Sequence, residues 1–261
     1  EIDYFVPAEE PLIVLQPPAI GPVEEQIGMN AASLIEDGAT LQLGIGSIPD
    51  AILSFLHDKH DLGVHTELFS DGVRGLVEEG VINGKRKTLH PGKVVSNFIM
   101  GTVELYNWVH ENAAIALYPE DYTNDPFVVA QNYRMTAINS ALEVDVLGQV
   151  AADTLGPMQF SGVGGQVDFV RGAARSPGGK SIIAFPATAK KGQVSRIVSV
   201  LARGSAVTTS RHDTDYIVTE YGIAFMKAKT VKERMEALIN IAHPDFRAEI
   251  RHDAYRTYFS F

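Results

Sequence analysis

The sequence predicts an α/β fold: an open, mostly parallel sheet with helices on both faces and with β-rich additions in the second half of the chain. Two observations predict it. Short apolar segments alternate with helix-length amphipathic segments up to about residue 118, and from Thr136 a long β-rich run and a turn-rich segment replace this alternation. Such alternation indicates right-handed parallel crossovers, and ligands of these sheets bind beyond the carboxyl ends of the strands.

The first half contains four predicted helices, each next to a short predicted strand. Apolar residues at helical spacing predict a helix from Val23 to Glu36, which the Asp37-Gly38 pair ends. A strand at Thr40–Leu43 leads through a glycine loop into a helix that Ser47 can cap. The pattern then recurs, with strands at 62–69, 93–99 and 113–118 and helices at 71–82 and 103–111.

The second half is predicted to hold further strands around two helices. A β-rich run covers 137–151, and the turn-rich segment 157–166 precedes a helix at 167–174. An amphipathic helix is expected from Thr230 to His243. The remaining strands are predicted at 181–186, 197–201, 206–208 and 216–219.

Composition excludes several classes of protein. The 261 residues are 45% apolar and 21% charged, which is typical of a globular protein with a sizeable core. Because 32 acidic residues outnumber 22 basic ones, the net charge of −10 argues against a nucleic-acid partner. The chain has no cysteine and its eight histidines lack zinc-site spacing, so no metal is expected. No apolar run approaches the roughly 18 residues that span a bilayer, so no membrane partner is expected either.

The start of the chain is punctuated by prolines and has no targeting pattern. It opens on Glu1, carries acidic residues instead of a basic region before an apolar one, and contains Pro7, Pro11, Pro17 and Pro18. We therefore expect residues 1–20 to connect to an upstream domain outside this sequence, and the length of the rest fits one large domain, or one plus a small lobe.

The loop Gly44-Ile45-Gly46 begins like a dinucleotide-binding fingerprint. Pro49 replaces its third glycine, however, and no acidic residue closes a second strand about 20 residues on. Two glycines still allow backbone N–H groups to approach an anion, and the following helix offers its positive end. The pattern leaves open both a ligand-contacting loop and a simple tight turn.

Glu67, in the stretch HTELFSDG, follows a predicted apolar strand and precedes a glycine turn. A lone glutamate is usually an exposed charge. Strand alternation nevertheless groups Glu67 with His65 and Phe69, and a carboxylate beside apolar walls and N–H donors is a better nucleophile than one in water. The segment Ser161–Gln166, with three glycines in four residues, could supply such donors, although its pattern alone favours a plain glycine turn.

Six motifs occur in the order in which the acetyl-CoA hydrolase/transferase family has them: GIGSIP, HTELFSDG, SGVGGQVDF, KKGQVSRIV, DYIVTEYGIA and ERMEALINIAHPDFR. The sequence most resembles the 4-hydroxybutyrate and butyrate:acetate CoA-transferase members, from about Pro18 to Arg247, in the C-terminal half of those proteins. The resemblance implies a NagB/RpiA/CoA-transferase-like fold made of two related open α/β domains, with 21–261 as the C-terminal catalytic domain.

The resemblance also implies a reaction and its site. The enzyme would move CoA between a short-chain acyl-CoA and acetate, butyrate or 4-hydroxybutyrate by ping-pong chemistry. Glu67 would attack the thioester, forming an acyl-glutamyl anhydride and then a glutamyl-CoA thioester. CoA would be a substrate, with no permanently bound cofactor and no metal. The CoA contacts that the resemblance implies are Gln42, Leu43, Gly44, Ile45, Gly46, Leu142, Gly165 and Lys191, with Lys190 as the alternative lysine.

Two other functions stay open at this point. Water could replace the acceptor carboxylate, which would make the protein an acetyl-CoA hydrolase. Alternatively, the sheet could hold a phosphorylated metabolite without catalysis. The resemblance implies a homodimer, and the absence of targeting signals and cysteines favours a cytoplasmic, bacterial enzyme.

Overall fold

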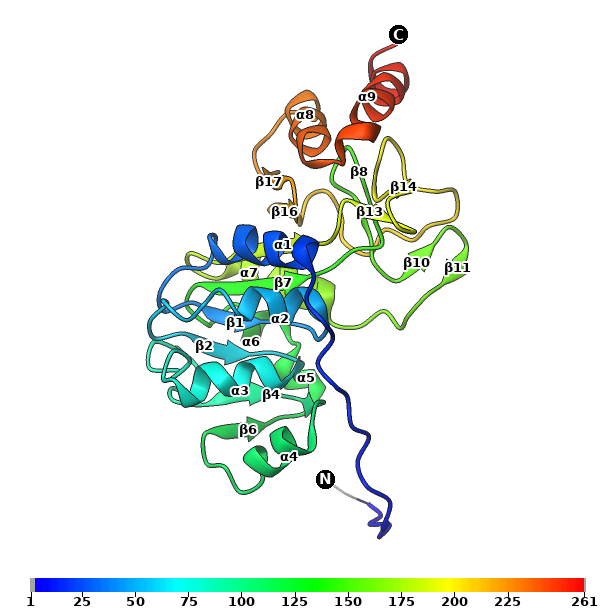
Figure 1. Ribbon diagram of the computed structural model, residues 1–261. Helices are drawn as coiled ribbons and strands as arrows, with labels where there is room; N and C mark the ends of the chain where they lie inside the picture. The colour runs from blue at the N-terminus through cyan, green and yellow to red at the C-terminus, as the bar shows by residue number, and fades with distance from the viewer. Residues whose placement is uncertain (1–2, 261) are drawn as a thin grey trace.

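The fold is built on one sheet of eight strands in the order β17-β16-β12-β7-β1-β2-β4-β6 (Figure 1). The structure is a computed structural model that describes residues 3–260, so residues 1, 2 and 261 lie outside it. The strands of this sheet are β1 (Thr40–Gln42), β2 (Gly63–His65), β4 (Val94–Ser96), β6 (Ile115–Leu117), β7 (Met135–Asn139), β12 (Lys180–Ala184), β16 (Tyr216–Thr219) and β17 (Gly222–Phe225).

The strand order reverses at β1. The chain first builds β2, β4 and β6 on one side of β1, then returns to place β7, β12 and β16 on the other side. These neighbours are parallel, with Thr40 opposite both Gly63 and Met135, and β17 alone runs antiparallel in this sheet. The open, mostly parallel sheet is therefore confirmed, and a crevice is expected between the carboxyl ends of β1 and β7.

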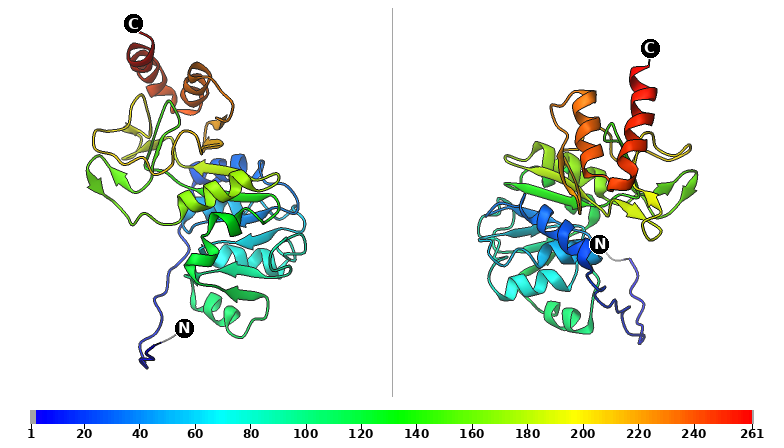
Figure 2. Two further views of the ribbon diagram at one scale, coloured as in Figure 1. Left: turned by 180° about the vertical axis from the view of Figure 1, so that it is seen from behind. Right: turned by 45° about the horizontal axis from the view of Figure 1, so that its top comes forward.

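Helices cover both faces of the sheet (Figures 1 and 2). One face carries α1 (Pro22–Ala32), α2 (Ser47–Leu53), α3 (Asp71–Glu78) and α4 (Val103–Val109), whose apolar side chains form the largest core. The other carries α5 (Glu120–Thr123), α6 (Pro126–Val129) and α7 (Gln166–Arg175), and here Phe169 packs with Met135 of β7. Gly28 lets α1 approach α2 closely, because a Cβ there would lie 2.8 Å from the Ala51 carbonyl.

Two predicted strands of the first half are each broken in two. The main-sheet strand β2 ends at His65, and Leu68–Phe69 forms a separate strand, β3, that pairs with β5 (Phe98–Ile99). The predicted strand at 93–99 divides in the same way into β4 and β5. The predicted helix at 23–36 is also too long, because α1 ends at Ala32 while Ile35, after a turn at 33–34, remains buried and continues the apolar pattern.

The β-rich additions of the second half are short strands outside the main sheet. They are β8 (Glu143–Asp145), β9 (Val150–Ala151), β10 (Thr154–Leu155), β11 (Met158–Gln159), β13 (Thr188–Ala189), β14 (Val194–Ser195) and β15 (Ile197–Val198). The predicted strand at 206–208 is wrong. A single bridge joins Val150 to Thr209, and the Thr208 hydroxyl instead bonds the N–H of Ala152 and the carboxylate of Asp153.

The C-terminal part ends in two helices, of which the sequence analysis predicted one. The predicted helix is α8 (Val231–Ile241). A reciprocal capping box between Thr230 and Glu233 caps its N-terminus. The second is α9 (Pro244–Phe259), where Pro244 takes the first helical position and the His243 ring accepts a hydrogen bond from the Asp245 N–H. With only two buried residues in its 16, α9 has too weak an apolar stripe for the sequence pattern to reveal the helix.

Residues 3–20 form neither helix nor strand and are mostly exposed. Two contacts tie this segment to the body near α4: the Leu15 N–H donates to the Gly101 carbonyl at 2.9 Å, and the Tyr106 hydroxyl donates to the Ile13 carbonyl at 2.6 Å. In the described part of the chain, no helix is both long and apolar enough to cross a membrane.

Candidate active site

Glu67 lies where β2 leaves the main sheet. Its carbonyl oxygen accepts hydrogen bonds from the N–H groups of Asn97 and Phe98, each at 3.0 Å, and from the Ser96 hydroxyl at 3.0 Å. These bonds hold the backbone at the point where the β2 and β4 strands both break. The Glu67 side chain is half-buried and lines a pocket of about 250 Å³, the Glu67 pocket, with Phe169 and Leu68 among its apolar walls.

Two donors converge on one oxygen of this carboxylate. The Asn124 side-chain amide donates to Glu67 Oε2 at 2.9 Å, and the Gly165 backbone N–H donates to the same atom at 3.1 Å. Among the described residues no donor bonds the other oxygen, Oε1. One oxygen is thus held by two N–H groups while the other is available to a ligand in the pocket, an arrangement typical of a nucleophile with an oxyanion site.

Gly165 has no room for a side chain. A Cβ at this position would lie 2.4 Å from Glu67 Oε2 and 2.5 Å from Asn124 Nδ2. The glycine therefore allows the backbone N–H to reach the carboxylate, and α7 begins directly after it at Gln166. The glycine-rich segment 161–166 lines the Glu67 pocket, and its contact with a ligand stays a prediction.

Asn124 is a site residue that the sequence analysis missed. Its side chain is buried, and the Thr123 hydroxyl donates to its Oδ1 at 3.2 Å, which directs Nδ2 toward Glu67. Its backbone N–H donates to the Glu120 carbonyl at 2.9 Å, at the end of the short helix α5. The sequence TNDPF signals a turn, and nothing in that signal locates Glu67, which lies 57 residues away.

His65, the last residue of β2, connects this strand to α5. Its ring is fully buried, and Nε2 donates to the Thr123 carbonyl at 2.9 Å. Burial lowers the pKa of His65 to about 4, so the ring is neutral at pH 7. A neutral ring that donates from Nε2 acts as a structural tie between β2 and the segment that carries Asn124.

The loop at 42–46 lies next to Glu67. The Thr66 hydroxyl contacts both the N–H and the carbonyl of Leu43, at 3.3 and 2.9 Å, and so ties the loop to the strand that carries Glu67. The Gln42 amide exchanges hydrogen bonds with the Asn139 amide at 3.3 and 3.0 Å. The predicted contacts Gln42, Leu43 and Gly44 all line the Glu67 pocket.

A second pocket of about 270 Å³ continues from the first, and Gly44 and Asn139 line both. Gly44, Ile45 and Gly46 line it together with 138–140 at the carboxyl end of β7, so it occupies the crevice where the strand order reverses. Gly46 has a φ of 117°, which side-chain-bearing residues rarely adopt. The loop therefore lines a pocket next to that of Glu67, and its contact with a ligand stays a prediction.

Two of the predicted contacts, Leu142 and Lys191, lie elsewhere, as does the alternative lysine, Lys190. Leu142 is half-buried and donates its N–H to the Ala151 carbonyl at 2.9 Å, and it lines neither of these pockets. Lys190 and Lys191 are exposed in the turn between β13 and β14, with φ values of 50° and 59°, and they too lie outside both pockets. Contact of Leu142 and Lys191 with CoA stays a prediction, as does the choice between the two lysines.

In residues 3–260 no group of three His, Asp or Glu side chains is placed to hold a metal ion.

Near Glu67, Asp168 in the first turn of α7 is a carboxyl group with a raised pKa. Burial raises the pKa of Asp168, the positive charge of Arg171 lowers it, and the negative charge of Glu67 raises it further. The site therefore gathers carboxylates and amide donors, a set suited to acyl chemistry.

Comparisons with known proteins agree with this chemistry. Residues 101–254 match the sequence model of the acetyl-CoA hydrolase/transferase C-terminal domain. The chain is 58% identical, over 97% of its length, to the 4-hydroxybutyrate coenzyme A transferase of Clostridium kluyveri, and 41% identical over 97% to the butyryl-CoA:acetate CoA-transferase of Anaerostipes caccae. Proteins named acetyl-CoA hydrolase match at lower identity.

A solved structure supports the same relationship. The crystal structure of 4-hydroxybutyrate CoA-transferase from Porphyromonas gingivalis superposes with a TM-score of 0.83 at 49% identity, over 95% of this chain and 59% of that one. The chain spans 59% and 58% of the two curated relatives above. With a family model that matches 101–254 and relatives that match nearly the whole chain, this protein belongs to the acetyl-CoA hydrolase/transferase family.

Proposed function

We propose that this chain carries the catalytic site of a CoA-transferase that moves CoA between a short-chain acyl-CoA and acetate, butyrate or 4-hydroxybutyrate. The observation that carries the proposal is the convergence of the Asn124 amide and the Gly165 N–H on Oε2 of Glu67, at the edge of a pocket that reaches the 42–46 loop. The relatives with the highest identity reported above are named as CoA-transferases.

In the proposed reaction, Oε1 of Glu67 attacks the thioester carbonyl and the CoA thiolate leaves, giving an acyl-glutamyl anhydride. The thiolate then attacks the glutamyl carbonyl carbon and the first carboxylate departs, leaving a glutamyl-CoA thioester. During this second attack, negative charge develops on Oε2, the atom that already has donors at 2.9 and 3.1 Å. Because these donors are in place beforehand, they stabilise the oxyanion without a cost of reorganisation.

The acceptor carboxylate reverses these steps. It attacks the glutamyl-CoA carbonyl, forms a second anhydride with Glu67, and receives CoA when the thiolate attacks the acyl carbonyl carbon. No step consumes water or needs a redox group, and each bond that breaks is replaced by one that forms. The Glu67 pocket and the adjoining crevice would hold the pantetheine end of CoA, with Leu142 and Lys191 contacting more distant parts of it.

The proposal extends to the whole protein. The curated relatives are longer than this chain, and we propose that an upstream domain, joined through residues 1–20, lines the carboxylate pocket. We also propose the two-domain NagB/RpiA-like fold, a cytoplasmic location and a homodimer. Size-exclusion chromatography with light scattering on the full protein tests the dimer.

Trapping of the covalent intermediate tests the mechanism. The protein is incubated with acetyl-CoA or butyryl-CoA, reduced with borohydride, digested and analysed by mass spectrometry. Reduction of a glutamyl thioester should convert Glu67 to its alcohol, a modification that a Glu67→Gln variant should lack. An unmodified Glu67 peptide from protein that is turning over substrate would contradict the mechanism.

The dependence of CoA release on the acceptor carboxylate distinguishes a transferase from a hydrolase. With acetyl-CoA as donor, butyrate should be converted to butyryl-CoA while free CoA stays at a background level. Release of free CoA at a rate independent of butyrate would instead indicate the acetyl-CoA hydrolase. A non-catalytic binding module would form no adduct in either case.

A further inference from the structure

A third pocket, of about 420 Å³, lies at the opposite edge of the sheet from Glu67. Asp215, which lines it, directly precedes β16, and its carboxylate accepts a hydrogen bond from the N–H of Ser181 near the start of β12 at 3.3 Å. Because these strands are parallel, the pocket is at their amino ends, whereas Glu67 follows the carboxyl end of β2. We call it the basic pocket. Its lining residues are Arg171, Ala174, Arg175, His212, Asp213, Asp215, Lys227, Ala228 and Arg234.

The basic pocket has a positive charge in a chain whose net charge is −10. Four lining residues are permanent cations and two are carboxylates, so the balance is 4 − 2 = +2 without His212. Each carboxylate already has a cation: Arg171 lies 3.6 Å from Asp213, and Lys227 lies 3.3 Å from Asp215. The two acids are therefore compensated inside the pocket, and the excess charge belongs to the remaining arginines.

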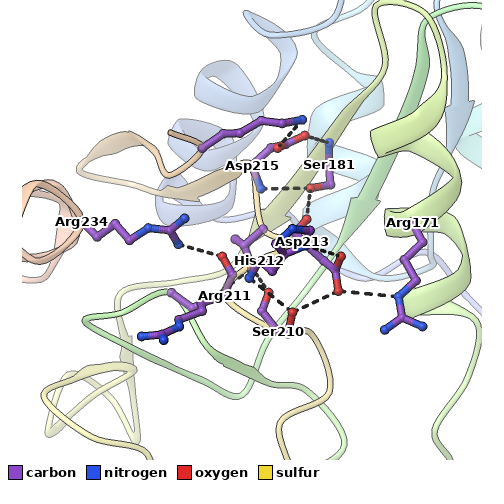
Figure 3. Close-up of polar contacts among 11 residues, drawn as sticks. Arg171, Ser181, Ser210, Arg211, His212, Asp213, Asp215 and Arg234 are labelled. Carbon is purple, nitrogen blue, oxygen red and sulfur yellow. Dashed lines mark hydrogen bonds and ion pairs between the residues drawn. The ribbon is translucent and has the colours of Figure 1, made fainter. Parts of the chain in front are cut away.

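Arg175 and Arg234 are those arginines. No carboxylate of the described chain lies within 4.0 Å of either guanidinium. Arg234 donates from Nη1 to the carbonyl oxygens of Leu147 at 3.2 Å and Arg211 at 2.8 Å, and Arg171 approaches the same segment from the opposite side (Figure 3). Burial, followed by repulsion from Arg211, lowers the pKa of Arg234, as expected for a cation without a counter-ion.

The backbone beside these cations is strained. Ala228, between Lys227 and the start of α8, has a φ of 57°, a conformation that residues other than glycine adopt at a cost. Ala228 itself lines the basic pocket. Strain of this kind is often associated with sites that bind ligands.

We propose that the basic pocket binds the diphosphate group of a small molecule, separately from the chemistry at Glu67. Planar guanidinium groups bind phosphate oxygens with charge-assisted hydrogen bonds, and Arg175 and Arg234 both line the pocket without a carboxylate partner. The volume is within the range of small-molecule sites, about 300–1,000 Å³. Diphosphates occur in free nucleotides and in CoA itself, and the second arm of the test distinguishes these sources.

Isothermal titration of the full protein with inorganic pyrophosphate, at low ionic strength, tests the site. We expect saturable binding that weakens as salt is added and that becomes about tenfold weaker in Arg175→Gln. Arg175 is suited to the test because it is exposed, so its loss should leave folding intact. Arg203→Gln, an exposed arginine outside the pocket, is the matched control and should bind like the wild type.

Absence of saturable binding, or equal affinity in the wild type and Arg175→Gln, would overturn the proposal. In the second arm, ADP and CoA are added to the protein saturated with pyrophosphate. Displacement by ADP but not by CoA would assign the site to a free nucleotide, displacement by CoA but not by ADP would assign it to the CoA diphosphate, and displacement by both would show that it accepts either diphosphate. Displacement by neither would overturn the proposal. Borohydride trapping in Arg175→Gln should still modify Glu67. A loss of pyrophosphate binding can therefore be told apart from a failure of the proposed transferase mechanism.

Discussion

Removal of the Asn124 amide is the sharpest perturbation of the candidate site. Glu67 Oε2 has two donors, Asn124 at 2.9 Å and Gly165 at 3.1 Å, and Asn124→Ala leaves one of them. Loss of one oxyanion donor typically lowers kcat by about 10²–10³, or about 3–4 kcal/mol of transition-state stabilisation. Folding should be little affected, because the Thr123 hydroxyl, which donates to Asn124 Oδ1, can still donate to the Pro119 carbonyl at 3.3 Å.

The assay measures transfer of CoA from acetyl-CoA to butyrate by the full protein, together with thermal unfolding. Asn124→Ala should lower kcat by at least about 100-fold while KM for acetyl-CoA changes little, since the donor acts mainly on the developing charge. Asn240→Ala, an exposed asparagine of α8, is the matched control. A kcat within about threefold of the wild type, in protein with unchanged Tm, would refute the role of Asn124 as an oxyanion donor.

Three further predictions follow from local geometry. Gly165→Ala should lower kcat by about 100-fold, because its Cβ would lie 2.4 Å from Glu67 Oε2 and must displace the carboxylate; transfer kinetics measure this. The folded-state pKa of His65, about 4, is below its unfolded value of 6.5, so its contribution to stability is present above pH 6.5 and is lost as the pH falls toward 4. Between pH 7 and pH 5, urea unfolding should therefore show that the free energy of unfolding falls by about 2 kcal/mol because of His65. The same fall in His65→Gln would contradict the assignment of this pH dependence to His65. Thr230→Ala removes the capping box of α8 and should lower the free energy of unfolding by about 1 kcal/mol with transfer activity intact; urea titration measures the first and the CoA assay the second.

Local sequence patterns predicted the elements whose apolar faces are regular. The strand, glycine loop and helix at 40–53 and the helix that became α8 have strong spacing and end signals, and both were found. The pattern failed where side chains or tertiary contacts override it. The N–H groups of Thr208 and Thr209 both donate to the Val150 carbonyl, which leaves a single bridge there, and α9 has few buried residues to reveal its period.

The sequence also identified Glu67 and the two glycine loops as candidates, but left each open between a functional and a purely structural explanation. In the structure both loops line the same pocket as Glu67, through 42–44 and 161–166, and their contact with a ligand stays a prediction. The structure leaves Leu142 and Lys191 outside that pocket. A side chain identified from a motif thus gains a physical role only when its neighbours are known.

By itself, the sequence determined the alternation of strands and helices, the parallel sheet that this alternation requires, and the edge of the sheet where ligands are expected. Only the tertiary structure decided that Asn124 and Gly165, which lie 57 and 98 residues beyond Glu67, donate to one oxygen of its carboxylate. The reason is that hydrophobic periodicity is local and fixes which face of an element is buried. The meeting of distant strand ends depends on the order in which the strands pair, and local periodicity does not record that order.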